Sequence, residues 1–307
     1  MSDTIVDRAV ASPAQDHAGR WPRFQDFVLS PNPGKRAAEK WLFCWFLITI
    51  PFQGLLMKTL SWAPGTSNDA ILVPQGVIMG LGAWFGPLVL RAKEDKGKPF
   101  YEVYGFKLGC FLAIWAMVGG YLGTDPWYEV LHGHFAFNTS LNPNGVPLFF
   151  LPMTIAVFGF YTVVLGAMFR VSWRAIGGPR LQGLPSGAAR VALIFVIACI
   201  LPLGETFFYK SASYCFDDTT GMWWLNVLIY GSWQFAALLF YPKFDEEPGE
   251  NQPVVHYVVT GFAAVGILMF GDQVLSEFVA PHFTNVIAGA QYVNDWSADN
   301  CLGPRPG

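Results

Sequence analysis

The chain has 307 residues, of which 53% are hydrophobic, 16% aromatic and only 13% charged, and its formal net charge is −3. An average soluble domain carries about 25% charged residues, so this hydrophobic chain is not a disordered protein, and it has no basic excess for nucleic acid. Five cysteines without paired spacing predict neither a disulfide framework nor a CxxC zinc site. The composition indicates a membrane protein.

Residues 1–38 are polar, contain Pro and Gly, and include no long apolar segment. They predict a solvated tail that ends in an interfacial segment over 21–40, not a cleaved signal peptide or a span. After this tail, stretches of about 20 mostly apolar residues, enough to cross a hydrocarbon core about 30 Å thick, recur along the chain. Seven stretches qualify: roughly 41–60, 71–90, 105–123, 147–169, 189–208, 223–241 and 255–280.

These stretches predict an all-α fold, a polytopic integral membrane helix bundle with about seven transmembrane helices. Its membrane domain covers 39–283, and an extramembrane tail follows over 284–307. Close helix packing is expected in the second span, where Gly76-xxx-Gly80 and Gly82-xxx-Gly86 have no preceding strand that would favour dinucleotide binding.

Basic residues gather in alternate loops, while the intervening loops contain only Lys58 and Lys210. The groups are Lys35, Arg36 and Lys40; Arg91, Lys93, Lys96, Lys98 and Lys107; and Arg170, Arg174, Arg180 and Arg190. Because cytoplasmic loops carry an excess of Lys and Arg, this alternation predicts a cytoplasmic N-terminus and an outer C-terminus. The expected location is a bacterial inner membrane or the endoplasmic reticulum.

Several enzyme and pigment classes lack their required residues. The last predicted span contains no Lys for a retinal Schiff base, and no G-x-S-x-G nucleophile motif occurs. Five histidines are too few for the clustered ligands of a di-iron desaturase. We therefore expect no metal and no nucleotide or other cofactor.

Acidic residues inside a hydrocarbon span are costly and indicate function by default. Glu205 and Asp272 lie about 16–17 residues from the cytoplasmic ends of their spans, about 25 Å along each helix. We therefore expect them at one depth, facing one cavity, with carboxyl oxygens within about 10 Å. The alternative is that both acids cap helix ends near the outer interface. Pro202 and Gly204 predict a kink or partial unwinding just before Glu205.

The predicted outer loops, 124–146 and 209–222, bring acids, imidazoles and aromatic rings to the same end. Further candidate catalytic acids are Asp125 and Asp217. Candidate substrate-binding residues are Tyr121, Trp127, His132, Tyr209, Tyr214, Trp223 and Trp224. An interfacial aromatic belt is the structural alternative for these rings. The residues alone indicate either proton chemistry on a large apolar substrate from the bilayer or lipid binding.

The order of polar landmarks resembles the cycloeucalenol cycloisomerase family, the cyclopropyl sterol isomerases, over roughly 32–302. These landmarks are Asn32-Pro-Gly-Lys-Arg36 with Glu39, Gly119-Gly-Tyr121, Asn144-Gly-Val-Pro147, Glu205-Thr206 with Tyr214 and Phe216, Pro242-x-Phe244, Asp272, and Asn300-Cys-Leu302. The chain departs from the family pattern at Asp125 and Glu129, which favours Glu205 and Asp272 as the catalytic pair.

The resemblance implies opening of the 9β,19-cyclopropane ring of cycloeucalenol-type sterols to a Δ8 sterol. A strained C–C bond is a weak base, so its proton donor must be a neutral acid, and a carboxyl group in an apolar cavity can keep its proton near neutral pH. The expected partners are a sterol from the bilayer and membrane lipids. The alternative function is a non-catalytic membrane sterol- or lipid-binding protein or carrier.

Cys215 and Cys301 both fall on the predicted outer side. In an oxidising compartment they can pair, which would tie the C-terminal tail over loop 209–222. Two free thiols are the alternative.

Overall fold

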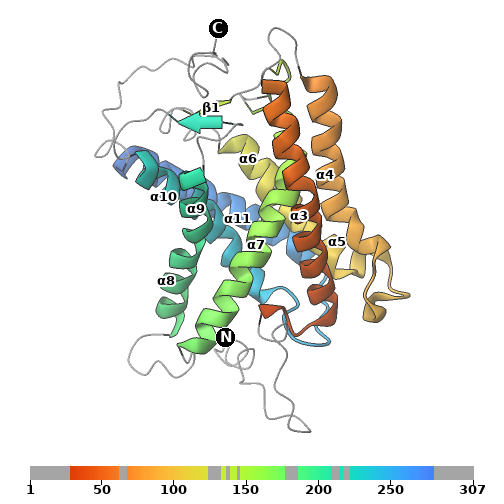
Figure 1. Ribbon diagram of the computed structural model, residues 1–307. Coiled ribbons are helices and arrows are strands. Elements are labelled where there is room, and N and C mark those ends of the chain that lie inside the picture. The colour runs from red at the N-terminus through yellow and green to blue at the C-terminus, as the bar shows by residue number, and fades with distance from the viewer. Residues whose placement is uncertain are drawn as a thin grey trace, which may run out of the picture.

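The computed structural model describes residues 28–61, 68–123, 133–135, 139–143, 146–176, 186–208, 214–216 and 222–279. Helices make up most of this part of the chain (Figure 1). The α-helices are α3 (Pro33–Ser61), α4 (Asp69–Val89), α5 (Tyr104–Leu112), α6 (Gly119–Leu122), α7 (Phe150–Ala175), α8 (Ser186–Ala198), α9 (Ile200–Phe208), α10 (Met222–Leu238) and α11 (Val254–Val274). Two π-helical segments, η3 (Ala113–Val118) and η8 (Leu275–Val279), continue α5 and α11, while η1 (Lys93–Asp95), η2 (Phe100–Glu102) and η7 (Tyr241–Lys243) are short 3₁₀ turns.

Five helical stretches within the described residues are long and apolar enough to cross a membrane. They are Asp69–Val89, Tyr104–Leu122, Phe150–Ala175, Gly187–Gly204 and Val254–Phe278. The predicted helical membrane bundle is therefore confirmed in its coarse form. The remaining two predicted spans, 41–60 and 223–241, are helical as α3 and α10.

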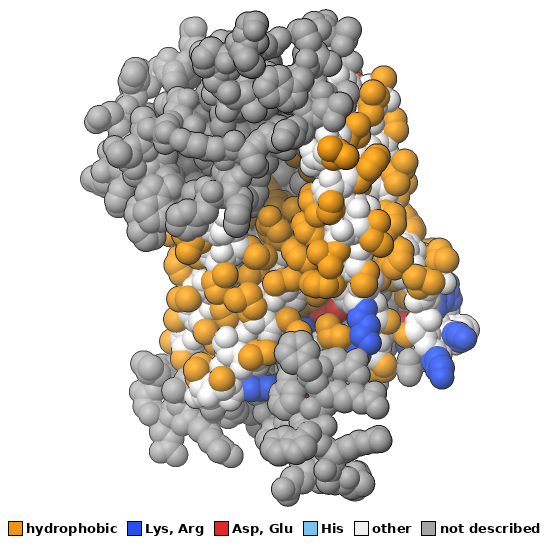
Figure 2. Space-filling view, in the orientation of Figure 1, with side chains coloured by type: hydrophobic (Ala, Val, Ile, Leu, Met, Phe, Trp, Pro, Cys, Tyr) orange, Lys and Arg blue, Asp and Glu red, His pale blue; other side chains and the backbone are white. Residues whose placement is uncertain are grey.

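Helix α7 lies in the middle of the bundle and packs against α3, α4, α8 and α10 (Figure 1). Its buried side chains, among them Phe158, Val163 and Leu165, join the two hydrophobic clusters of the core. Hydrophobic side chains also cover most of the outward-facing surface of the described helices, and Lys and Arg gather below this band (Figure 2). An apolar exterior of this extent is expected of helices that face lipid.

Glycines allow α4 to approach its neighbours closely, as the sequence predicts. A Cβ atom on Gly76 or Gly80 would overlap the backbone carbonyl of Phe149 or Pro152 in the α7 region. On the face toward α3, a Cβ on Gly82 would overlap the Trp45 ring. The Trp45 indole donates a hydrogen bond of 2.8 Å to the Met79 carbonyl, which fixes the distance between the two helices.

The fifth predicted span is interrupted, as expected from Pro202. Helix α8 ends at Ala198, Cys199 forms a turn, and α9 begins at Ile200. Proline has no N–H to donate to the carbonyl of Ala198, four residues earlier, so the helix loses a hydrogen bond at this point. A helix break is therefore present, but it lies at Cys199, six residues before Glu205, and the residues just before Glu205 are helical.

The two predicted outer loops meet at one end of the bundle. Strand β1 (Gly133–Phe135) pairs antiparallel with β2 (Tyr214–Phe216), with His134 opposite Cys215. Near the start of α4, the Asp69 carboxylate accepts hydrogen bonds from the Ser140 N–H at 2.8 Å and the Leu141 N–H at 3.2 Å. These contacts tether the segment before α7 to the N-terminus of α4.

Candidate functional site

A buried polar centre in the described part of the bundle joins α3, α7 and the segment after α10. The Lys35 ammonium group donates hydrogen bonds of 2.8 Å to the carbonyls of Tyr241 and Phe244 and pairs with Glu246 Oε2 at 2.5 Å. Lys35 is completely buried, and burial lowers its pKa, while the charges of Glu246 and Glu39 oppose this shift. The ammonium group is thus held by two carbonyl oxygens and one carboxylate.

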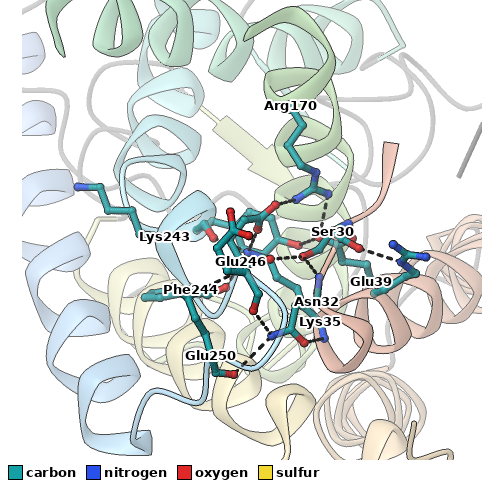
Figure 3. Close-up of polar contacts among 12 residues, drawn as sticks. Ser30, Asn32, Lys35, Glu39, Arg170, Lys243, Phe244, Glu246 and Glu250 are labelled. Carbon is teal, nitrogen blue, oxygen red and sulfur yellow. Dashed lines mark hydrogen bonds and ion pairs between the residues drawn. The ribbon is translucent and has the colours of Figure 1, made fainter. Parts of the chain in front are cut away.

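Arg170 of α7 completes this centre (Figure 3). Its guanidinium group pairs with Glu39 at 2.8 Å and with Glu246 at 3.4 Å. The hydroxyl group of Tyr241 donates a 2.6 Å hydrogen bond to the same Glu39 oxygen. We call Lys35, Glu39, Arg170, Tyr241 and Glu246 the clamp. Its two cations and two carboxylates balance.

The glutamate of the clamp that follows α10 is held as an anion. Burial alone raises the pKa of Glu246, but the nearby charges of Lys35 and Arg170 outweigh burial and bring the pKa below its ordinary value. Its partner Glu39 also accepts a 2.8 Å hydrogen bond from the Ser30 N–H. Charge balance and multiple partners are what buried ions require, so the clamp is best explained as a structural element.

A second buried pair supports the same segment. The Lys107 ammonium group pairs with Asp245 and donates to Asn251 Oδ1 at 2.9 Å and to the Gln252 carbonyl at 2.8 Å. Asp245 adopts a φ of 39°, in the left-handed region, and its other oxygen accepts the Gln252 N–H at 2.7 Å. The segment after α10 is therefore folded around two buried lysines.

A further buried polar centre is formed by a carboxyl group near the end of α11. Asp272 is 2% exposed, and its Oδ1 lies 3.0 Å from the hydroxyl oxygen of Ser232 on α10. Its Oδ2 has no hydrogen-bond partner among the described residues. A Cβ atom on Gly123 would lie 3.2 Å from this oxygen and 2.9 Å from the Trp233 ring. We call Gly123, Ser232, Trp233 and Asp272 the carboxyl site.

Aromatic rings lead from the carboxyl site into the core. The Trp233 ring lies 5.6 Å from that of Phe158, which lies 5.4 Å from Trp115. Both π-helical segments lie near this region: η3 carries Trp115, and η8 begins three residues after Asp272. Such segments are frequent at functional sites. A buried acid can transfer a proton to a substrate. The faces of neighbouring aromatic rings can stabilise the positive charge that then forms on the substrate.

The other predicted site residues are described to different extents. Glu205 lies on α9, which packs against α10 as α11 does, but its side chain is outside the described residues. The predicted proximity of Glu205 and Asp272 therefore stays a prediction. Tyr121 is on α6 and 41% exposed.

The remaining candidates belong to the loops or to element ends. Tyr214 lies in β2, and Trp223 and Trp224 lie in α10. Their side chains are outside the described part of the structure. Asp125, Trp127, His132, Tyr209 and Asp217 lie outside the described residues. Cys301 does too, so its bridge to Cys215 stays a prediction. Cys44, Cys110 and Cys199 are free thiols.

The sequence pattern presents Glu39 only as a family landmark and Arg170 only as a topological charge, and it does not single out Glu246. A charge-balanced set of two basic and two acidic residues was the available signal, but its members are up to about 200 positions apart along the chain. Within the described ranges, no three His, Cys, Asp or Glu residues are grouped to hold a metal ion. No known family, curated protein or solved structure matches the chain.

Proposed function

We propose that this chain is a membrane sterol isomerase that opens the 9β,19-cyclopropane ring of cycloeucalenol-type sterols to a Δ8 sterol by acid–base catalysis. The observation that carries the proposal is the carboxyl site. Asp272 is buried at one end of an apolar bundle, has one oxygen without a hydrogen-bond partner among the described residues, and lies beside Trp233. The order of landmarks that resembles the cyclopropyl sterol isomerases supports it independently.

In this proposal α3 and α10 are spans as well, which makes seven. The end of the bundle that carries the clamp and the loop after α4 then faces the cytoplasm, because basic residues are concentrated in its loops. The carboxyl site lies toward the opposite side, near the β1–β2 pair, in a bacterial inner membrane or the endoplasmic reticulum.

The chemistry needs an acid and a base, and no change in oxidation state. The acid gives its proton to C19, and the electron pair of the C9–C19 bond becomes the new C–H bond. Positive charge is left at C9, where an aromatic face stabilises it. The base then takes the proton from C8, and the electron pair of that C–H bond forms the C8–C9 double bond.

Asp272 and Glu205 are the proposed acid and base. Asp125 and Asp217 are further candidates on the loops. Tyr121, Trp127, His132, Tyr209, Tyr214, Trp223 and Trp224 are the proposed contacts to the sterol. The apolar exterior gives the substrate a route from the bilayer.

The test is to incubate membranes containing the protein with cycloeucalenol in D₂O and to analyse the sterols by mass spectrometry. We expect a Δ8 sterol that carries deuterium in its C19 methyl group. Membranes with Asp272→Asn provide the control. Cycloeucalenol that is retained by the purified protein but returned unchanged would contradict catalysis and identify the non-catalytic sterol binder or carrier instead.

A further inference from the structure

The hydroxyl group of Ser232 has two oxygen neighbours at hydrogen-bond distance. Its oxygen lies 2.7 Å from the carbonyl oxygen of Ile229 and 3.0 Å from Asp272 Oδ1. A serine hydroxyl has one hydrogen to donate and two lone pairs to accept with. The positions of the hydrogens in these two contacts therefore depend on each other.

The Ile229 carbonyl can only accept, so the shorter contact takes the hydrogen of Ser232. The contact between Ser232 and Asp272 then lacks a hydrogen unless the carboxyl group supplies one. A protonated Asp272 satisfies both contacts, with Oδ1–H donating to Ser232 and Ser232 donating to Ile229. An ionised Asp272 would leave one of these two contacts without a hydrogen.

The described elements packed against Asp272 offer no positive charge to hold a carboxylate. Helices α6 and α10 and segment η3 contain no charged residue, and their titratable side chains are Tyr121, which is 41% exposed, and Tyr230. In η8, Glu277 is exposed and accepts a hydrogen bond from Gln273 of α11. Lys107 of α5 is bound to Asp245. The donors beside Asp272 are neutral, the Ser232 hydroxyl group and the Trp233 indole N–H. A carboxylate buried without a cation is strongly disfavoured.

We propose that Asp272 carries a proton in the resting protein and is the acid of the reaction, with Ser232 as its positioning residue. The role of Asp272 as the acid rests on the proposed function, whereas its protonation in the resting protein does not. When the Oδ1–H bond breaks and the proton bonds to C19, the hydroxyl hydrogen of Ser232 turns from Ile229 to the new carboxylate. The proton from C8 then goes to a separate base, the role that remains for Glu205.

Infrared spectroscopy of the purified protein in lipid nanodiscs tests the resting proton without any sterol. The difference between wild type and Asp272→Asn at neutral pH should contain the C=O band of a carboxylic acid, shifted in D₂O. A difference that contains only carboxylate bands would overturn the assignment. Glu277→Gln, which changes an exposed carboxylate in the same region of the chain, is the matched control and should remove carboxylate bands only.

Substitutions of Ser232 test its role and do not require Asp272→Asn to fold. In Ser232→Ala the acid C=O band should shift, because its O–H loses the acceptor, and kcat should fall about tenfold or more with little change in KM, since a hydrogen bond to a charged group contributes about 1.5–3 kcal/mol. Ser232→Thr, which keeps the hydroxyl group, should restore both. An unshifted band in Ser232→Ala would overturn the role of Ser232.

The two proposals fail separately. An acid band without sterol turnover would overturn the sterol isomerase and leave the protonated Asp272 standing. Turnover with an ionised Asp272 would support the isomerase and make Asp272 its base.

Discussion

The clamp and the carboxyl site are both buried and polar, yet their atoms are satisfied to very different degrees. In the clamp, Lys35 and Arg170 face Glu39 and Glu246 at 2.5–3.4 Å, and the remaining donors go to carbonyls. In the carboxyl site, one acid faces one hydroxyl group, and its other oxygen has no hydrogen-bond partner among the described residues. A structural ion network needs a partner for every charged group, while a carboxyl oxygen with no described partner, beside aromatic rings, is available for a ligand.

The clamp and the carboxyl site also differ in the parts of the chain that they connect. The clamp joins residues about 200 positions apart and fixes the basic end of the bundle. The carboxyl site joins only α6, α10 and α11, next to segments that continue into the predicted outer loops. Changes in the clamp should therefore act on stability, and changes in the carboxyl site should act on turnover.

The largest effect is expected from Arg170→Met. It leaves Glu39 without its cation and Glu246 with Lys35 alone, and the loss of one partner from a buried ion pair costs about 3–5 kcal/mol. Equilibrium unfolding in mixed micelles measures the change. Lys96→Met, at an exposed lysine, is the control and should change stability by less than about 0.5 kcal/mol. Equal stabilities of the two variants would show that the clamp is not structural.

Asp272→Asn should lower turnover of the cyclopropyl sterol at least about 100-fold, the typical contribution of a positioned acid or base. Glu205→Gln should do the same. The free energy of unfolding should change little for Asp272→Asn, because an amide replaces a carboxyl group of nearly the same shape. Glu277→Gln should retain activity, and a loss of turnover equal to that of Asp272→Asn would contradict a specific role for Asp272.

Gly123→Ala should have a smaller effect on the carboxyl site. Its Cβ would lie 2.9 Å from the Trp233 ring and 3.1 Å from the Gly119 carbonyl, so the neighbours must shift, at about 1–3 kcal/mol. We expect turnover to fall about tenfold, because the shift displaces Trp233 from Asp272. Gly120→Ala, whose Cβ would lie 3.8 Å from the same ring, is the matched control and should be close to wild type. Identical kinetics of the two variants would place the substrate elsewhere.

The smallest effect is a pH dependence of the clamp. The pKa of Glu246 is lower in the folded protein than its ordinary value of 4.5, so below that pH the unfolded chain binds more protons. Its contribution to stability is complete above pH 4.5 and is lost as the pH falls through the folded pKa, by at most about 1.4 kcal/mol per pH unit. Unfolding of Glu246→Gln should lack this component, and an unchanged acid slope in that variant would refute it.

Much of the helical architecture is predictable from local pattern. Apolar stretches of span length predict the helices, since backbone groups in lipid must be satisfied within the segment. Pro202 predicts the break in α8–α9, and Gly76, Gly80 and Gly82 predict close packing. Asp272 is also identifiable from the sequence, because an acid inside an apolar span is unusual wherever its partners lie.

The partners themselves depend on the tertiary structure. The sequence shows Lys35, Arg170 and Glu246 as three separate charges in separate loops, and only the packing of α3, α7 and the segment after α10 brings them within ion-pair distance. Likewise, the sequence places Asp272 in a span, but the packing of α10 on α11 decides that it meets Ser232. The physical reason is range: hydrophobic length and helix geometry are properties of contiguous residues, whereas hydrogen bonds and ion pairs act over a few ångströms between residues that the chain itself keeps far apart.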